Sequence, residues 1–352
     1  MTRSDLFASV PDLQLPEPDP DQPRRAAIVG AGVCGLVTAR LLQRAGWDVT
    51  VFDKARGPGG RLSTRREKEL QFDLGAQYFV ARDKRFQALV DSLAKAGAVG
   101  AWAPRFVQLD GEGNFLPDPA KGWLVGTPRM SALTAALAEG CTTEYSCRIE
   151  ILEQDFDGWR LATEDGRDFD NFEQVLLTCP APQAATLAMD FPEVSDELEM
   201  VTMLPCWAVM VGLDATLDLP FDAAAVDASP LSWIACNSSK PGRPARSAWV
   251  LHASPEFSIE HEDDEPAAIA RVLTTEFLRL IDKPGLKPSL SLAHRWLYAR
   301  PDEPLGRPCL YDPELRLGAA GDWCVSANVE GAFLSAVALA ETVANSAPPD
   351  QF

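Results

Sequence analysis

The chain has 352 residues, of which 46% are hydrophobic and 24% are charged, and its formal net charge is −19. These values are typical of a globular protein with a large core, and the length suggests two domains. The negative charge argues against nucleic acid or an anionic membrane surface as a partner, because phosphate groups attract basic patches. The eight cysteines form no C-x-x-C pair, and we find no apolar signal segment or membrane-spanning run, so we expect reduced thiols in a cytoplasmic protein.

Residues 26–53 describe half of a dinucleotide site. An apolar strand at 26–29 runs into a G-x-G-x-x-G turn formed by Gly30, Ala31, Gly32, Val33, Cys34 and Gly35. The first two glycines permit a tight turn and the close approach of a pyrophosphate, and the third allows a helix at 35–45 to pack against the strand. A second strand at 48–52 ends at Asp53, an acceptor for ribose hydroxyls. The alternative is a glycine-rich turn without a ligand.

A second glycine-rich turn at residues 57–61 indicates which dinucleotide binds. Basic residues gather around this GPGGR sequence in an otherwise acidic chain, namely Lys54, Arg56, Arg61, Arg65, Arg66 and Lys68. The turn resembles the G-G-R motif of the flavin-containing amine oxidase superfamily, in which a second loop contacts the FAD pyrophosphate. The resemblance implies FAD as the cofactor, with Lys54, Gly60 and Arg61 beside it. The alternative is a solvated basic surface.

Residues 72–79, FDLGAQYF, lead toward a helix expected over residues 84–96. Together with the following ARDKRFQALV, this sequence is similar to the renalase family of FAD-dependent oxidases, in which GAQYF lies beside the flavin. The cofactor contacts that this resemblance implies are Gly75, Ala76, Gln77 and Tyr78. A glycine next to two hydrogen-bonding side chains suits a backbone that passes close to a flat ring. The alternative is a turn with a satisfied polar pair.

The next region combines a helix with several strands. A helix is expected from about residue 130, with the hydroxyl of Thr127 as its cap. Strands are expected at 143–152, 159–163 and 174–178, after which residues 179–183 cross into another domain. Ile149 is the position that the resemblance matches to a backbone contact with adenine.

Residues 200–300 change to strands and one long helix. Segments rich in aromatic and β-branched residues predict strands at 206–213, 231–236, 248–253 and 289–298, and the helix covers 264–281. We expect an antiparallel sheet with one face over the flavin. The segments NSSKPGR, WVLHAS and AHRWLYARP, which begin at residues 237, 249 and 293, resemble blocks of the renalase family. His252 and Trp296 are the pocket candidates, and the alternatives are a hydrogen-bonded core histidine and a core tryptophan.

Residues 317–324 form a strand that ends in Gly-Asp-Trp, and a helix follows from Val329 to about residue 344. This is similar to the C-terminal FAD motif of the amine oxidase superfamily. The resemblance implies that Asp322 meets the ribityl chain or a phosphate and that the helix N-terminus faces the flavin, where its dipole stabilises negative charge on the reduced ring. The implied contacts are Gly321, Asp322, Glu330, Gly331 and Ala332. Both ends of the chain must therefore reach one cofactor.

The pattern predicts an α/β fold in which a Rossmann-like FAD-binding domain of the glutathione-reductase type carries an inserted α+β substrate domain built on an antiparallel sheet. Residues 1–25, rich in proline and acidic residues, are expected to be an irregular extension. The FAD-binding domain is expected to be discontinuous, over residues 26–79, 120–185 and 306–346. The substrate domain is expected over residues 80–119 and 186–305.

The resemblance to renalase implies oxidation of misreduced NAD(P)H isomers by hydride transfer to the flavin, which O2 then reoxidises to give hydrogen peroxide. The side chains that it places around the nicotinamide are Tyr78, His252, Trp296 and Trp323, and those that it places near the rest of the dinucleotide are Asn237 and Arg243. One alternative is a flavin amine oxidase acting on a primary amine or polyamine, usually with a lysine near flavin N5, but lysine is absent from residues 241–282 and 288–352. A second is a non-catalytic FAD-binding protein. With three histidines in the chain, no metal site is expected.

Overall fold

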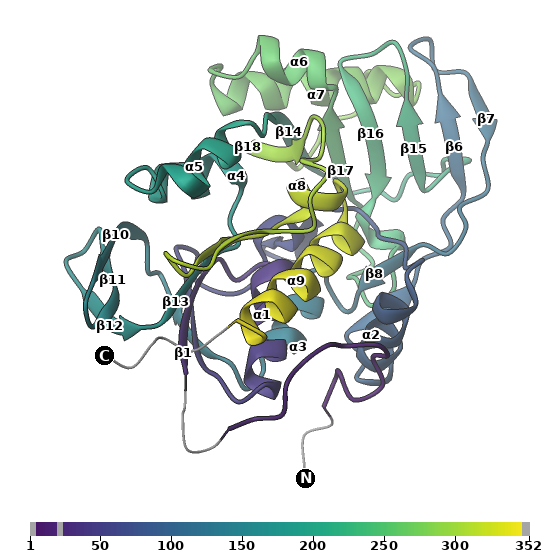
Figure 1. Ribbon diagram of the computed structural model, residues 1–352. Coiled ribbons are helices and arrows are strands. Elements are labelled where there is room, and N and C mark those ends of the chain that lie inside the picture. Colours follow the sequence, from purple (N-terminus) through teal and green to yellow (C-terminus); the bar gives the residue numbers. More distant parts are fainter. Residues whose placement is uncertain (1–4, 20–23, 347–352) are drawn as a thin grey trace.

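The computed structural model describes residues 5–19 and 24–346, and its two largest sheets lie in different parts of the molecule (Figure 1). The first sheet has the strand order β19-β20-β13-β1-β2-β9. Its members are β1 (Arg25–Val29), β2 (Asp48–Asp53), β9 (Thr142–Tyr145), β13 (Gln174–Leu177), β19 (Leu310–Asp312) and β20 (Leu317–Ala319). Neighbouring strands are parallel except for the edge pair β19 and β20. Parallel sheets are buried on both faces, and the apolar runs of β1 and β13 are accordingly buried.

Two helices from opposite ends of the chain pack side by side against this sheet. Helix α1 (Val33–Arg44) follows β1 directly, and the C-terminal helix α9 (Val329–Ala344) lies along it (Figure 1). Leu36 of α1 and Phe333 of α9 belong to one apolar core, and helix α3 (Ala132–Ala138) contacts α1 from another side. The β1-α1-β2 unit and the parallel sheet confirm the expected Rossmann-like fold.

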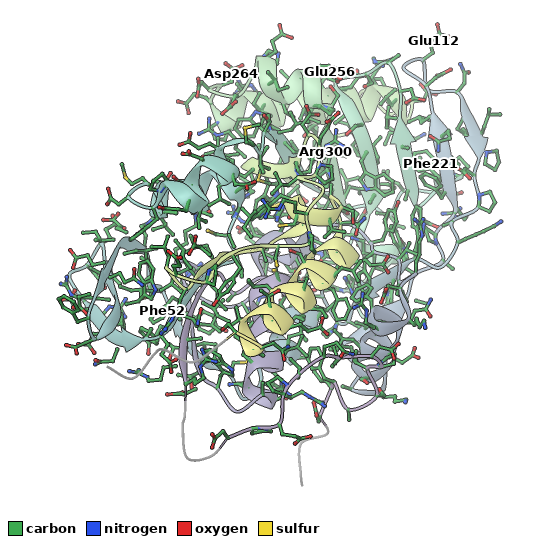
Figure 2. All side chains as sticks on the ribbon, in the orientation of Figure 1. Phe52, Glu112, Phe221, Glu256, Asp264 and Arg300 are labelled. Atoms are coloured by element: carbon green, nitrogen blue, oxygen red, sulfur yellow. The ribbon has the colours of Figure 1, made fainter. Side chains whose placement is uncertain are left out.

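The second sheet has seven strands in the order β18-β14-β17-β16-β15-β6-β7. They are β6 (Phe106–Leu109), β7 (Phe115–Pro117), β14 (Met203–Gly212), β15 (Ala223–Val226), β16 (Leu231–Cys236), β17 (Ala248–Ala253) and β18 (Leu290–Pro301). Helices α6 (Pro255–Glu260) and α7 (Pro266–Leu280) cover one of its faces. The sheet is antiparallel as expected except at one pair, because β6 pairs in parallel with β15, whose sequence AAAV lacks the signal of a strand. Figure 2 shows how far apart the two sheets lie, with Phe52 in the first and Phe221 beside the second.

A small antiparallel sheet replaces part of one expected strand. It consists of β10 (Ile149–Asp155), β11 (Gly158–Thr163) and β12 (Asp168–Phe172). The expected strand at 143–152 is divided, because β9 pairs with β2 whereas β10 pairs with β11. At the break, Ser146 has a left-handed backbone with φ 51°, and its N–H bonds to the carbonyl of Ala55.

The N-terminal extension contains no helix or strand within residues 5–19, and part of it is buried. Leu6, Phe7 and Val10 join the core that also holds α1 and α9. Asp5 forms an ion pair with Arg44 of α1. Residues 1–4 and 20–23 of the extension lie outside the described residues.

The expected cap at Thr127 is wrong. Its hydroxyl donates to the carbonyl of Gly97 (2.7 Å), and the residue before α3 is Ser131. Helix α2 (Lys84–Lys95), by contrast, begins close to the expected position, because the Asp83 carboxylate accepts the N–H groups of Arg85 and Phe86.

The remaining elements are short. They are β3 (Thr64–Glu67), β4 (Leu70–Asp73), β5 (Val99–Ala101), β8 (Leu124–Gly126), α4 (Ala181–Leu187), α5 (Pro192–Glu199), α8 (Asp322–Val325) and the 3₁₀ turns η1 (Gly60–Leu62) and η2 (Asn237–Ser239). Within the described ranges, the helices are too short or too polar to span a membrane. The same ranges contain no cluster of three or more His, Cys, Asp or Glu side chains suited to a metal ion.

Candidate functional site

The two glycine-rich turns expected to bind phosphates lie against each other. Gly30 has φ +120°, and a Cβ on Gly35 would lie only 1.9 Å from the Gly30 carbonyl oxygen, so α1 packs directly on the turn. The N–H of Gly59 bonds to the carbonyl of Ala31 (3.1 Å) and brings the second turn onto the first. A Cβ on Gly32 would meet nothing within 4 Å, and none of the described side chains caps α1. Open space at an uncapped helix N-terminus suits a pyrophosphate.

Asp53 lies at the end of β2, where a ribose acceptor was expected. One carboxylate oxygen accepts the N–H of Ala31 (2.6 Å), and the other accepts the N–H of Ala55 (2.7 Å). Each oxygen has two lone pairs, so the carboxylate can still accept ribose hydroxyls. The same two bonds fix its position relative to the turn.

Arg61 and Asp322 join the early and late cofactor motifs. The guanidinium Nη1 and Nη2 donate to the two carboxylate oxygens at 2.8 and 2.6 Å, and Nη1 also donates to the carbonyl of Ala299 in β18 (3.2 Å). The two residues are separated by 261 positions in the sequence. This two-pronged ion pair therefore brings both ends of the chain and the seven-stranded sheet together, as a single shared cofactor requires.

One predicted role in the late motif is wrong, that of Trp323 as a pocket side chain, whereas the contact of Glu330 through the helix N-terminus stays a prediction. Trp323 is fully buried, and its indole N–H donates to the carbonyl of Cys179 (3.2 Å), so it belongs to the core and cannot form a pocket wall. The carboxylate of Glu330 accepts the N–H groups of Arg82 and Asp83 (2.5 and 2.9 Å), which directs it toward the start of α2. Only the backbone of Glu330 is left for a cofactor.

The backbone at the start of α9 is tightly packed. Asn328 caps the helix by accepting the N–H of Gly331 (2.8 Å). A Cβ on Gly331 would lie 2.1 Å from the carbonyl oxygen of Ser326, and a Cβ on Gly321 would lie 2.2 Å from the indole nitrogen of Trp323. Glycine at both positions is thus explained by contacts within the chain, while Ala332 follows in the first turn of α9.

The loop formed by residues 74–78 rests on the second glycine turn. The N–H of Ala76 bonds to the carbonyl oxygen of Arg61 (3.0 Å), and a Cβ on Gly75 would lie 2.0 Å from the same oxygen. We expected this glycine to make room for a flat ring, but the backbone of Arg61 already accounts for it. The carbonyl of Leu74 accepts the His252 Nε2–H (2.9 Å) and the Trp296 Nε1–H (3.3 Å). Two predicted pocket residues therefore meet at this loop.

Beneath the loop lies a buried ionic cluster formed by Asp73, Lys240 and Arg243. The side chains of all three are completely inaccessible to solvent. One Asp73 oxygen accepts from Lys240 Nζ (3.2 Å) and Arg243 Nη2 (2.7 Å), and the other accepts from Thr64 Oγ1 and the Met130 N–H (2.7 and 3.0 Å). Burial disfavours the carboxylate, but Lys240 and Arg243 outweigh it and lower the pKa of Asp73 to about 2. Burial lowers the pKa of Lys240 to about 8, despite the neighbouring Asp73.

Two more predicted contacts with the dinucleotide are therefore wrong. Arg243 is committed to Asp73 and to the carbonyl of Gly126. Asn237 is fully buried, donates to the carbonyl of Gln71 (2.9 Å) and accepts from the Asp73 N–H (3.4 Å). Both side chains fasten β4 to the segment after β16, because buried polar groups require partners.

Lys240 was missed as a site residue. Its Nζ donates to Gln77 Oε1 (3.1 Å), so the Gln77 amide nitrogen faces the carbonyls of Asp73 and Gly75 (2.5 and 3.0 Å). The predicted contact of Gln77 with the cofactor thus competes with three bonds within the chain. In the sequence, Lys240 is a single lysine within the segment NSSKPGR, whose neighbouring residues Asn237 and Arg243 were expected to contact the substrate, and nothing else marks it as a site residue.

The face of the seven-stranded sheet opposite α7 has small residues in the middle and aromatic rings around them. Cross-strand register places Ala208 of β14 opposite both His252 of β17 and His294 of β18. Trp233 of β16 lies opposite His252 on its other side, and Trp296 lies opposite Cys206. Side chains directly opposite each other share a face, so these residues line one surface.

Tyr78 completes an aromatic group at the edge of this surface. Its ring stacks on Trp123 with centroids 3.8 Å apart and an interplanar angle of 8°. The ring centroid of Trp233 lies 5.7 Å from that of Tyr78 and 5.7 Å from that of Phe106. Burial raises the pKa of the Tyr78 hydroxyl, so it is protonated at neutral pH. Trp123, Trp233 and Phe106 were not predicted, since isolated aromatics carry no spacing signal.

His252 is half-buried and neutral. Burial lowers its pKa to about 4, although the bond to the Leu74 carbonyl favours the charged form. Tyr78, His252 and Trp296 therefore lie around one surface that combines aromatic rings with an uncharged imidazole. Such a surface suits a flat, neutral ring.

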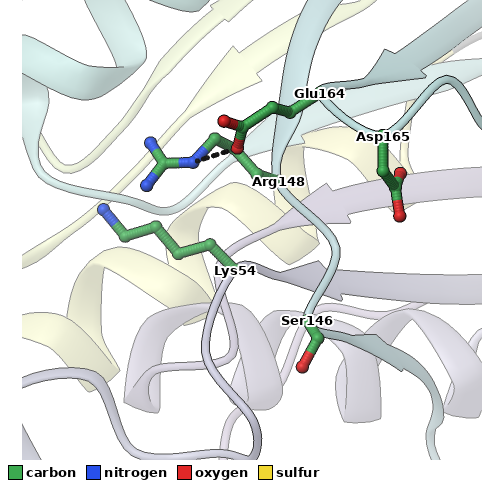
Figure 3. A pocket seen from close by; sticks show the side chains of 5 residues that line it. All are labelled: Lys54, Ser146, Arg148, Glu164 and Asp165. Carbon is green, nitrogen blue, oxygen red and sulfur yellow. Dashed lines mark ion pairs between the residues drawn. The ribbon is translucent and has the colours of Figure 1, made fainter.

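A separate polar hollow of about 350 Å³ opens beyond the end of β2 (Figure 3). It is lined by Lys54, Ser146, Arg148, Glu164 and Asp165. Arg148 pairs with Glu164 (3.2 Å), whereas the Lys54 ammonium extends toward the hollow from the residue after Asp53. Ile149 begins β10 beside this hollow and pairs with Thr163. Lys54 thus lines the hollow, Ile149 follows the lining residue Arg148 in the sequence, and the contact of both with the cofactor stays a prediction.

Comparison with known proteins connects the chain to flavoproteins. A family model described as flavin containing amine oxidoreductase matches residues 97–344, and one described as NAD(P)-binding Rossmann-like domain matches residues 28–93. A solved structure assigned as a protoporphyrinogen oxidase from Exiguobacterium sp. 255-15 has a TM-score of 0.71 and 16% identity, and the match covers 92% of this chain and 99% of that one. At that identity the match shows the fold alone.

Curated relatives match shorter stretches. Acetone monooxygenase (methyl acetate-forming) of Gordonia sp. (strain TY-5) is 29% identical over 171 residues, which is 49% of this chain and 28% of the relative. The zeta-carotene-forming phytoene desaturase of Myxococcus xanthus is 48% identical over 54 residues, or 15% of this chain and 10% of the relative. An L-amino-acid oxidase of Crotalus adamanteus is 45% identical over 53 residues, with the same coverage. The chain spans less than a third of the length of these relatives.

Proposed function

The chain belongs to the family of flavin containing amine oxidoreductases, and from this premise we propose that it is a renalase-like oxidase of misreduced NAD(P)H isomers. The family and the relatives support an FAD-dependent oxidoreductase with FAD as the cofactor. In the proposed reaction, a dihydronicotinamide with its hydride at the wrong ring carbon becomes NAD(P)⁺. O2 is the final electron acceptor and becomes hydrogen peroxide.

The residues present fit FAD. The open side of Gly32 at the uncapped start of α1 would receive the pyrophosphate, and Asp53 would accept the ribose hydroxyls. The neighbouring Gly60 turn would cover the same phosphates, with Arg61 held in place by Asp322. When bound, the flavin supplies the capacity to accept a hydride and to transfer electrons to O2.

The observation that carries the substrate proposal is the uncharged aromatic surface formed by Tyr78, Trp233, His252 and Trp296. A dihydronicotinamide ring is flat and neutral and loses its hydride without a strong base. The low pKa of His252 keeps its imidazole uncharged, which avoids placing a cation beside the pyridinium product. The chain's contribution is to orient the ring and to exclude water.

Anaerobic mixing of the holoenzyme with 1,2- or 1,6-dihydro-NAD(P) tests the proposal. We expect the flavin absorbance to bleach within the mixing time and the product to be NAD(P)⁺. Admission of O2 should restore the absorbance and release one equivalent of hydrogen peroxide for each substrate oxidised. An unbleached flavin with both isomers would contradict the proposal.

An amine oxidase is the second candidate, and Lys240 is the observation in its favour. This lysine lies outside the segments in which lysine is absent, and it reaches the loop that carries Tyr78. However, its ammonium is already bound by Asp73 and Gln77, so it has little freedom to activate a water molecule. Bleaching by benzylamine or spermine, and not by the dihydronicotinamides, would favour this candidate.

A further inference from the structure

His252 presents an unused hydrogen-bond acceptor on the sheet surface. The Leu74 carbonyl can only accept, so the His252 Nε2 that lies 2.9 Å from it must carry the proton. In this tautomer Nδ1 has a free lone pair. Among residues 5–19 and 24–346, Nδ1 has no hydrogen-bond partner, and it is not sealed from solvent.

Trp233, directly opposite on the next strand, presents an unused donor. Its indole nitrogen is buried and has no partner in the described part of the chain. Six other tryptophans donate their indole N–H to a protein acceptor, namely Trp102, Trp159, Trp207, Trp249, Trp296 and Trp323. Trp233 Nε1 is one of five buried side-chain atoms without a partner among the described residues, and a buried donor without a partner destabilises the folded state unless a ligand supplies one.

The donor and the acceptor lie on one face of the sheet, with small side chains on either side of them. The register pairs Trp233 with His252, and the next residues in the same row are Ala225 on β15 and Ala208 on β14. Cβ atoms that face each other across antiparallel strands are about 5 Å apart. One ligand on this face can therefore contact both side chains.

We propose that Trp233 and His252 recognise a primary carboxamide, with the Trp233 indole N–H donating to its carbonyl oxygen and its NH2 donating to His252 Nδ1. This rests on the proposed function, because the nicotinamide ring carries that substituent. An amine has no carbonyl oxygen and leaves the Trp233 donor unpaired. Because the indole nitrogen is covered, binding also requires Trp233, or one of the rings of Tyr78 and Phe106 near it, to turn.

The test compares ligands that differ only in this substituent. The holoenzyme is titrated by calorimetry with NAD⁺ and with 3-acetylpyridine adenine dinucleotide, which keeps the carbonyl oxygen but has no N–H. Trp233→Phe retains the ring and removes the donor, so both ligands should bind about tenfold more weakly. His252→Gln retains a donor for Leu74 and removes Nδ1, so only NAD⁺ should weaken about tenfold. Trp249→Phe removes an indole bond to Ser247 on the opposite face of the sheet and should change neither affinity.

The outcomes separate this inference from the proposed function. If the dihydronicotinamides bleach the flavin but Trp233→Phe and His252→Gln bind both ligands as the parent protein does, the inference is wrong and the oxidase proposal survives. If they do not bleach the flavin, titration with nicotinamide itself decides. Loss of nicotinamide binding in Trp233→Phe would uphold carboxamide recognition without the oxidase, and unchanged or absent binding would overturn it.

Discussion

The parallel sheet and the seven-stranded sheet contribute to the candidate site through different parts of the chain. At the parallel sheet the site is made of backbone, because Gly30, Gly35 and Gly59 set the course of the turns and α1 begins without a side-chain cap. At the other sheet it is made of side chains, such as His252 and Trp233, that project from neighbouring strands. A site made of tightly packed backbone tolerates almost no added atoms. A site made of side chains depends on their hydrogen-bond partners and on their protonation states.

The largest expected effect concerns the buried ionic cluster formed by Asp73, Lys240 and Arg243, whose side chains depend on one another as partners. Asp73→Asn leaves Lys240 and Arg243 as two buried cations with no anion between them, so we expect a loss of about 4 kcal/mol in the free energy of unfolding. Chemical denaturation measures it. Glu69→Gln, which breaks an exposed pair with Arg246, is the control and should cost less than about 1 kcal/mol. Equal losses would show that the cluster is no more critical than a surface pair.

Gly35→Ala tests the backbone region. The added Cβ would lie 1.9 Å from the Gly30 carbonyl oxygen, so α1 must move off the turn. We expect a loss of about 3 kcal/mol and FAD release during gel filtration. Gly57→Ala, whose Cβ would meet nothing within 4 Å, should retain both stability and FAD. Retention of FAD by Gly35→Ala would refute the tight packing of this turn.

These backbone features are also those that the sequence predicts well. Glycine spacing, the strand before Gly30 and the acid at Asp53 are all local, so they can be recognised without knowing the fold. Tertiary pairing is not local. Trp323, Asn237 and Arg243 were assigned to the pocket because of their neighbours in the sequence, yet their side chains are inside the protein.

Lys240 is the opposite case, a residue at the site that the sequence does not predict. Its partners Asp73 and Gln77 are separated from it by 167 and 163 positions, so nothing near it in the sequence marks it as part of the site. The division of one expected strand into β9 and β10 has a similar cause, since each half pairs with a different sheet. Sequence patterns describe faces and turns, but they do not identify which distant groups meet.

Acid titration tests the side-chain region. Unfolded His252 binds a proton below about pH 6.5, whereas in the folded protein its pKa is lowered to about 4. Between these values the unfolded state binds more protons, so stability falls as the pH falls from 6.5 to 4 and His252 contributes no further loss below that. We expect this contribution to be about 2 kcal/mol, allowing for partial exposure.

His252→Gln supplies the comparison for that titration. Denaturation at pH 7 and pH 4.5 should show a smaller difference for this variant than for the parent protein. Asp73 does not affect this comparison. Its pKa is lowered from 3.8 to about 2, so the stability that it contributes is lost only as the pH falls below about 3.8. Identical pH dependence in the two proteins would mean that folding does not lower the pKa of His252.

The smallest expected effect concerns Trp323. Trp323→Phe removes one buried indole bond to Cys179 while retaining most of the ring volume, so we expect a loss of about 1 kcal/mol. The affinity for NAD⁺ should not change, because the side chain is fully buried. A tenfold fall in that affinity would show that Trp323 lines the pocket and would contradict its assignment to the core.

The ion pair between Arg61 and Asp322 has a consequence for how the protein is made. Its two halves are separated by 261 positions, and the parallel sheet likewise places β13 and β20 from later in the chain beside β1. A ribosome delivers the glycine turns early, but the carboxylate that holds Arg61 and the helix that packs on α1 follow more than 250 residues later. Early segments must therefore wait, with apolar surface exposed, until residues 322–344 have emerged. The two halves of the candidate cofactor site cannot meet before that point.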